Sequence, residues 1–211
     1  WEITYKVFAN GIIKVDNRFV AEGTETPMIP RVGLRMQLSE ILNDLTYYGR
    51  GPEENYRDRR TSQFIGEYTT PIKDLYEPYI RPQENEHRTD IYWCALTTKQ
   101  KAGLLFIADR TFELNASNYL LGSLDSGETI DNGAPRTNET NHRHLTDPQP
   151  VKQVDMFIDY RMMGVGGDNS WGAIAHEPYL IRPGVENAIE YGFSIVPFDK
   201  KADYKNLIYQ Y

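Results

Sequence analysis

The sequence predicts an all-β protein, a two-sheet sandwich or a barrel, from three observations. Apolar and polar residues alternate with period two in most patterned stretches, which is typical of half-buried strands. Short runs of Gly, Pro, Asn and Asp separate these stretches, and many short strands with regular turns indicate a sandwich or a barrel. Fifteen Tyr and three Trp add an aromatic content that favours strands. The 211 residues permit one large domain or two small ones, and one two-sheet domain over residues 1–211 is preferred.

The first half of the chain contains strand patterns and one helix-like segment. Residues 13–19 alternate apolar and charged side chains and predict a strand. Residues 39–45 favour a helical turn, because Ser39 is a suitable N-cap and the apolar residues after it share a helical face. Residues 104–108 are continuously apolar, which predicts a central strand that is covered on both faces.

The second half contains the clearest alternation, in residues 154–162. Every second residue there is apolar, while Asp155 and Asp159 lie on the other face and Phe157 is the exception. The pattern predicts a half-buried strand whose aspartates face solvent. Residues 191–195 alternate in the same way and predict another strand.

Charge and composition exclude several classes of partner. A net charge of −7 and a pI of about 5.2 argue against nucleic acid and against an anionic membrane surface. No segment approaches the roughly 18 apolar residues of a membrane span. The single cysteine, Cys94, has no partner for an internal disulfide, and we expect it to be buried in the apolar run 91–96.

The two ends of the chain carry a further expectation. The first residue is Trp1 rather than Met, so we expect an excised piece of a longer multidomain chain. The compartment of that parent, cytoplasm or periplasm, is then left open. Residues 200–211 form a mixed polar and aromatic tail that is either a short helix or a linker.

No pair of carboxylates stands out as a catalytic pair. Glycoside hydrolysis normally needs two carboxyl groups that flank one bond. Glu53 and Glu54 are adjacent and would point to opposite faces of a strand, and they follow a Gly-Pro turn. Asp155 and Asp159 share the face expected to be solvated. We therefore predict no catalytic residue in this chain.

Metal binding has only weak support. His142 and His144 would share one strand face, but no second His or Cys cluster completes the four ligands of a closed zinc site. Residues 83–90 offer carboxylate and amide oxygens that calcium accepts, but their spacing matches no EF-hand loop. We predict no metal ligand and no cofactor, and at most weak structural cation binding in 83–90.

The segment Gly164–Trp171 is the most informative part of the chain. Its glycines permit positive φ and close backbone approaches, and a large aromatic follows. The dinucleotide pattern fails because Asn169 stands at its third glycine, and no phosphate-loop Lys follows. The local sequence leaves two alternatives open: Trp171 presents its indole outward, or it packs into the core.

Arginines gather just before the middle of the chain, beside acidic residues. Because the guanidinium fork matches carboxylates, the stretch predicts a buried or interfacial salt-bridge network. The arginines are Arg50, Arg57, Arg59 and Arg60, and the acidic residues are Glu53, Glu54 and Asp58.

Taken in order, five motifs resemble the C-terminal domain of the large bacterial β-galactosidases of glycoside hydrolase family 2, also called the small-chain or fifth domain. Each motif is weak alone, but the ordered series is specific and covers the chain to about Phe198. The motifs are Pro30–Arg35, Tyr48–Arg59, Glu84-Asn85 with Arg88, His142–Leu145 and Gly164–Trp171.

The resemblance implies a large antiparallel two-sheet β-supersandwich, similar to galactose mutarotase. It also implies that a separate barrel domain holds the catalytic glutamates and the metal ions, Mg and Na. Trp171 matches the residue that stacks on the glucose, or aglycone, of lactose. The supporting loop residues are Gly166, Gly167, Asp168, Asn169 and Ser170.

The implied partners are therefore a galactoside sugar, the catalytic barrel of the same parent chain and, in a homo-oligomeric parent, sister subunits. The fragment alone is expected to be catalytically inactive. Two other functions stay open. One is a free-standing aldose 1-epimerase, which would need a His and a Glu facing one sugar. The other is a purely structural assembly module, which an exposed apolar patch would favour.

Overall fold

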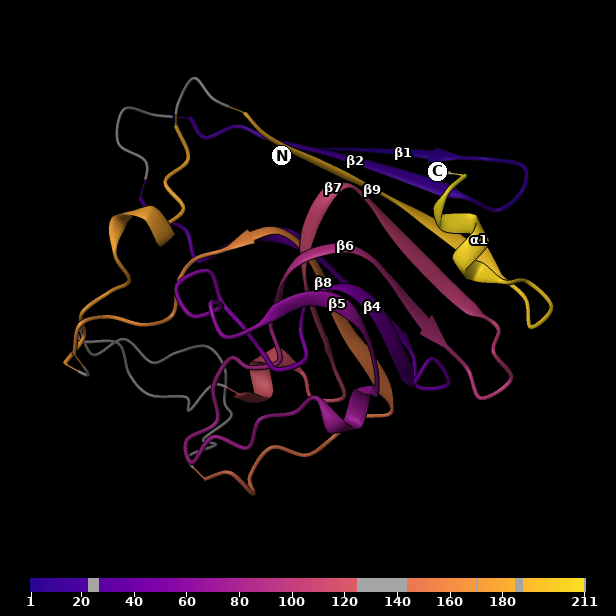
Figure 1. Ribbon diagram of the computed structural model, residues 1–211. Helices are drawn as coiled ribbons and strands as arrows, with labels where there is room; N and C mark the ends of the chain where they lie inside the picture. The colour runs from indigo at the N-terminus through magenta and orange to yellow at the C-terminus, as the bar shows by residue number, and fades with distance from the viewer. Residues whose placement is uncertain (23–26, 125–143, 170, 185–187, 211) are drawn as a thin grey trace.

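The computed structural model describes residues 1–22, 27–124, 144–169, 171–184 and 188–210. These residues form antiparallel strands with little helix (Figure 1). The strands are β1 (Glu2–Val7), β2 (Ile13–Phe19), β3 (Arg31–Ser39), β4 (Asp44–Gly51), β5 (Phe64–Pro71), β6 (Arg88–Thr97), β7 (Gly103–Ser117), β8 (Gln153–Met162) and β9 (Ile189–Phe198). The helical pieces are η1 (Ile72–Asp74), η2 (Leu121–Leu124), η3 (Glu177–Tyr179) and α1 (Tyr204–Ile208).

The long strand β7 joins two parts of the sheet. Its first half, Gly103–Ala108, pairs with β9 in the order β1-β2-β9-β7-β6-β4-β5. Its second half, Glu113–Ser117, pairs with β8, and β8 pairs with β3. In Figure 1, β1, β2 and β9 therefore run along one side, while β8 diverges from them. The predicted all-β, antiparallel architecture is confirmed, with the two sheets continuous through β7.

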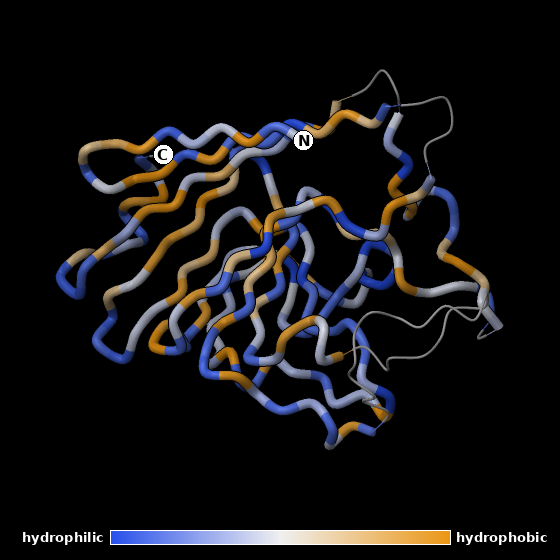
Figure 2. Tube along the Cα trace, turned by 180° about the vertical axis from the view of Figure 1, so that it is seen from behind, coloured by the Kyte–Doolittle hydropathy of each residue, from blue (hydrophilic) through white to orange (hydrophobic). Residues whose placement is uncertain are grey.

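Apolar side chains form two clusters on the two faces of this sheet. The larger cluster lies between the sheet parts and includes Phe106, Phe112 and Phe193. The smaller cluster lies on the opposite face of β6, β7 and β9, where Tyr204 and Leu207 of α1 cover it. Figure 2 shows the matching pattern, with apolar segments in the strands and hydrophilic turns at many of their ends.

Several local predictions are confirmed. Residues 13–19, 154–162 and 191–195 lie in β2, β8 and β9, and 104–108 lies in the interior strand β7. Cys94 is a free, fully buried thiol whose pKa is raised by burial. The tail contains the short helix α1, whose N-cap Asp203 accepts a hydrogen bond from the Lys205 amide at 3.1 Å. No helix among the described residues is long and apolar enough to cross a membrane.

The helical turn predicted for residues 39–45 is wrong. Ser39 ends β3, a tight turn follows in which the Leu42 amide donates to the Ser39 carbonyl at 3.0 Å, and β4 starts at Asp44. Ile41 is 62% exposed, so the apolar residues do not form one buried helical face. Pairing of β3 with β8 and of β4 with β5 and β6 outweighed the local helical pattern.

The prediction of a solvent-facing side for residues 154–162 is also wrong. Asp155 is 1% exposed and Asp159 is 0% exposed. Strand β3 places arginines against them: Arg35 donates to both Asp155 oxygens at 2.7 and 2.8 Å, and Arg31 Nε lies 3.0 Å from Asp159 Oδ2. Buried carboxylates require such partners, so a charged face can be a covered one.

Candidate functional site

The loop that begins at Gly164 leaves β8 and presents an aromatic side chain to solvent. Trp171 is 92% exposed, so its indole does not pack into the core. The outward alternative for Trp171 therefore holds in the structure. Ser170, expected to support the loop, lies outside the described residues.

The glycines of this loop allow contacts that a side chain would block. A Cβ on Gly167 would lie 2.1 Å from the carbonyl oxygen of Ala173. A Cβ on Gly164 would lie 2.7 Å from the Asp58 carboxyl carbon and 2.8 Å from Ala175 Cβ. Both contacts are closer than atoms tolerate, which explains why small residues are needed where the chain turns back on itself.

Successive amides attach the start of the loop to the body of the molecule. The Met163 amide donates to the Pro30 carbonyl at 2.9 Å, and the Gly164 amide donates to the Tyr179 carbonyl at 2.8 Å. The next two amides, of Val165 and Gly166, donate to Oδ1 and Oδ2 of Asp58 at 3.2 and 2.7 Å. One carboxylate from a distant turn thus holds two consecutive loop amides.

Polar side chains within the loop shape its approach to Trp171. The Asn169 side chain accepts a hydrogen bond from the Trp171 amide at 2.8 Å, an Asx-type turn that fixes the local backbone. Asp168 Oδ1 lies 2.7 Å from His176 Nε2, across the loop. Both residues of this pair are exposed, so the pair contributes order to the loop more than stability.

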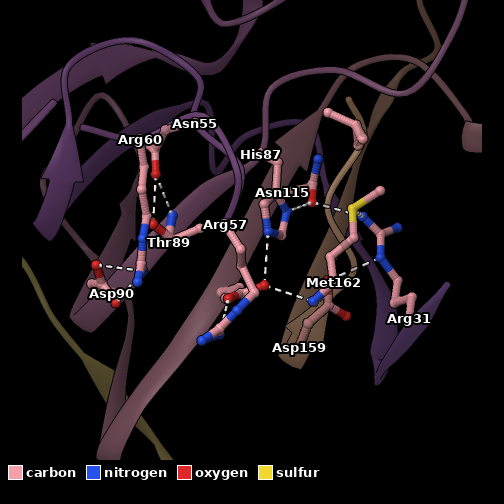
Figure 3. A network of polar contacts seen from close by, with 12 residues as sticks. Arg31, Asn55, Arg57, Arg60, His87, Thr89, Asp90, Asn115, Asp159 and Met162 are labelled. Carbon is pink, nitrogen blue, oxygen red and sulfur yellow. Dashed lines mark hydrogen bonds and ion pairs between the residues drawn. The ribbon is translucent and has the colours of Figure 1, made fainter. Parts of the chain in front are cut away.

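A buried polar network lies at the base of this loop, where β8 ends (Figure 3). Glu113 of β7 is its centre. Its Oε2 accepts a hydrogen bond from the Met162 amide at 2.6 Å and lies 3.0 Å from His87 Nε2. Its Oε1 accepts from Arg57 at 3.2 Å. Glu113 therefore links the last residue of β8 to the turn that carries Asp58.

The hydrogen bonds of His87 indicate that its ring is protonated on both nitrogens. Asn115 donates its amide group to Glu84 at 3.0 Å and to the Asn85 carbonyl at 2.7 Å, so its oxygen is left to accept from His87 Nδ1 at 2.7 Å. The other nitrogen faces the Glu113 carboxylate. Burial by itself lowers the pKa of His87, but the hydrogen bond and charge of Glu113 outweigh it and raise that pKa.

Two carboxyls in this region have pKa values that burial raises. For Asp159, burial raises the pKa to about 7 although the Arg31 charge opposes the change. For Glu86, burial raises the pKa to about 8, against the Ser117 hydrogen bond. Both side chains are almost fully buried, so neither can approach a sugar from solvent.

The arginine cluster forms the predicted salt-bridge network, with partly different partners. Arg59 pairs with Glu54, as expected. Arg50 and Arg60 both pair with Asp90, at 2.8 and 2.9 Å, rather than with the neighbouring acidic residues. Sequence proximity did not identify Asp90 because strand pairing, not the local chain, brings it to the arginines.

The other candidate residues are dispersed. Of the adjacent Glu53 and Glu54, Glu54 is engaged in an ion pair with Arg59, and the backbone amide of Glu53 donates to the side chain of Gln63. In residues 83–90, arginines occupy oxygens considered for calcium, since Arg31 pairs with Glu84 at 2.8 Å. His144 is exposed and lies outside the strands, while His142 lies outside the described residues.

Asp58 and His176 are loop residues that reasoning from the sequence did not identify. Asp58 precedes the loop by more than a hundred residues, and only the tertiary fold brings the two together. The weak signal available was an acidic residue between Arg57 and Arg59, inside one of the recognised motifs.

Comparisons with known proteins give one consistent result. The model of a family described as beta galactosidase small chain matches residues 1–195. A β-galactosidase of Priestia megaterium is 32% identical over 179 residues, which cover 85% of this chain and 16% of that protein. β-Galactosidases of Lactococcus lactis and Vibrio cholerae are 31% and 30% identical and cover 85% and 84% of this chain. The matched region is 16% and 15% of those two proteins, so the chain spans about a sixth of such relatives.

Proposed function

The chain belongs to the β-galactosidase small-chain family, and we propose that it is the C-terminal accessory domain of a glycoside hydrolase family 2 β-galactosidase. In this proposal, a separate barrel domain of the parent chain supplies the catalytic carboxylates and the Mg and Na ions. The present domain completes the mouth of that active site. Its contribution is a carbohydrate contact made by Trp171.

The observation that carries the proposal is the exposure of Trp171 on an anchored loop. An indole that is 92% exposed has no packing role in this chain, yet the backbone on both sides of it is held by Asp58, Asn169 and the Asp168–His176 pair. A flat, amphipathic ring held in one place suits the apolar face of a pyranose. The loop residues Gly166 and Gly167 serve as its supports.

Stacking of this kind gives modest binding with a defined orientation. The indole would hold the departing aglycone sugar near the barrel while the glycosyl group is hydrolysed. It would also hold an acceptor sugar for transfer in place of water. The contact therefore affects both the affinity for the aglycone and the ratio of transfer to hydrolysis.

The test is Trp171→Ala in the full-length parent enzyme. Loss of one aromatic contact, about 0.5–1.5 kcal/mol, predicts a rise of roughly 2- to 12-fold in KM for lactose and less transglycosylation. The matched control is Tyr209→Ala, which removes another aromatic side chain that is 89% exposed. If the kinetics on lactose do not change in the Trp171 variant, the proposed sugar contact is wrong.

The epimerase alternative has less support. That reaction needs an acid and a base that reach the sugar. His87 is 0% exposed and both of its nitrogens are engaged, by Asn115 and Glu113. Among the described residues, His144 and His176 are exposed but lie on loops, and His176 already faces Asp168.

An assembly role is favoured by a different observation and is compatible with the main proposal. Strand β1 is exposed along its whole length, and its apolar residues Ile3, Tyr5 and Val7 are 37%, 59% and 72% exposed. Exposed apolar edges of this kind mark contacts with other protein surfaces. The proposed partners are the barrel domain and, in an oligomeric parent, sister subunits.

A further inference from the structure

The carboxylate of Asp58 contacts the tryptophan loop, Gly164–Trp171, from a turn more than a hundred residues earlier in the chain. We propose that Asp58 is a positioning residue: it fixes the loop backbone and thereby the place of the Trp171 indole. The consequence for aglycone and acceptor sugars rests on the proposed function of Trp171. The role of Asp58 in placing the loop does not depend on that function.

The Asp58 carboxylate accepts hydrogen bonds from two consecutive backbone amides. Oδ1 accepts from the Val165 amide at 3.2 Å and Oδ2 from the Gly166 amide at 2.7 Å. Adjacent amides that converge on one anionic group form a concave donor site, which a carboxylate with two acceptor oxygens fills. An Asn side chain has one acceptor oxygen and would lose one of the two bonds, and an Ala would lose both.

The turn that carries Asp58 is fixed on both sides. Its neighbour Arg57 donates to Glu113 of β7, while Arg60 pairs with Asp90. Backbone hydrogen bonds between Tyr56 and Arg59 close the turn, at 2.8 and 3.4 Å. Asp58 is therefore held relative to the sheet, so its two acceptors define a fixed point for the loop.

Along the loop, Gly166 is the last residue before Trp171 whose backbone is hydrogen-bonded to the body of the molecule. Among the hydrogen bonds of the described residues, those beyond Gly166 join the loop to itself and to its returning arm, through Asn169 and through Asp168 with His176. A displacement at Gly166 is therefore carried to Trp171. The close approach of Gly164 to Asp58, 2.7 Å for an added Cβ, shows that the two segments also fit sterically.

The first measurement is amide hydrogen exchange of the full-length parent protein at Val165 and Gly166. Asp58→Ala should accelerate exchange there by roughly 10- to 100-fold, because hydrogen bonds to a charged group are lost. Asp58→Asn should give a smaller increase. The matched control is Asp74→Ala, at an exposed aspartate beside Lys73, which should leave exchange in the loop unchanged. Unchanged exchange in the Asp58→Ala protein would overturn the proposal.

The second measurement is a double-mutant cycle on lactose, with KM and the transfer-to-hydrolysis ratio as readouts. If Asp58 acts through Trp171, Asp58→Ala should shift both readouts in the direction of Trp171→Ala. It should add nothing further in a Trp171→Ala background. Effects that add in full would mean that Asp58 acts elsewhere, and this would overturn its positioning role.

Two arrangements keep the outcomes distinguishable. If Trp171→Ala is silent on lactose, the proposed function fails, while hydrogen exchange still decides whether Asp58 holds the loop. If Asp58→Ala does not fold, Gly164→Ala perturbs the same contact from the loop side, since its Cβ would press on the Asp58 carboxyl group. That variant should reproduce the fast exchange and the shifted KM, and wild-type values for both would count against the proposal.

Discussion

At the scale of single residues, burial decides what the charged side chains of this protein do. Asp155, Asp159, Glu86 and Glu113 are all at most 4% exposed. Each has a neighbour that compensates for the loss of water: Arg35, Arg31, Ser117 and Arg57 respectively. None of these four groups is accessible to a substrate, and Glu113 also holds the base of the tryptophan loop through the Met162 amide.

Glu86 gives a testable pH dependence. Burial raises its pKa to about 8, so the folded protein keeps a proton that the unfolded chain releases above about pH 4.5. Stability from this group therefore falls as pH rises through that window, by at most about 1.4 kcal/mol per pH unit. Glu86→Gln mimics the protonated form and should flatten the fall, so the variant is more stable than wild type at pH 9.

Urea unfolding at several pH values between 5 and 9 measures this effect. Glu40→Gln is the matched control, because Glu40 is exposed. Burial also raises the pKa of Asp159, to about 7, which lies in the same range, so the comparison is between variant and wild type rather than between pH values. Parallel pH profiles for Glu86→Gln and wild type would contradict the prediction.

At the scale of elements, β1 is an edge strand whose residues are all exposed. It pairs with β2 through six residue pairs and ends the strand order of the sheet. Its apolar residues Ile3, Tyr5 and Val7 alternate with the polar Glu2, Thr4 and Lys6. The apolar face is thus an organised surface that is exposed among the described residues.

This surface predicts self-association of the chain when it is expressed alone. Val7→Lys places a charge on the apolar face and should shift the chain toward monomer, since a charged side chain opposes burial of that face against a second copy. Thr4→Lys, on the polar face of the same strand, is the control and should have little effect. Sedimentation velocity distinguishes the variants, and equal self-association in both would show that β1 is not the contact.

At the scale of the whole molecule, the chain has an extensive core and an anchored loop, but we predict that it is inactive by itself. At the loop base, Glu113 and Asp159 are buried and paired with arginines, and His87 cannot reach solvent. The Asp58 carboxylate is bonded to the loop amides. The chain alone should not cleave a chromogenic galactoside and should bind glucose weakly or not at all. Galactoside cleavage would reveal a catalytic pair that we did not identify, and rapid interconversion of galactose anomers would support an epimerase.

Much of the fold was predictable because strand patterning is local. Alternation within 13–19, 154–162 and 191–195 identified β2, β8 and β9. The prediction of a solvent-facing side of β8 failed at Asp155 and Asp159, because β8 is covered on both faces. In the sequence, charged residues in buried ion pairs look the same as charged residues that face solvent. The turn after Ser39 was misassigned because sheet pairing overrode a helical pattern.

The sequence by itself determined the strands β2, β7, β8 and β9, the buried Cys94, the family and the composition of the loop that ends at Trp171. These depend on neighbours in the chain or on an ordered series of motifs. Only the tertiary structure decided that Trp171 is exposed, that Asp58 anchors Val165 and Gly166, and that Asp90 receives two arginines. Such contacts join residues far apart along the chain, and local periodicity carries no information about which distant strands pair.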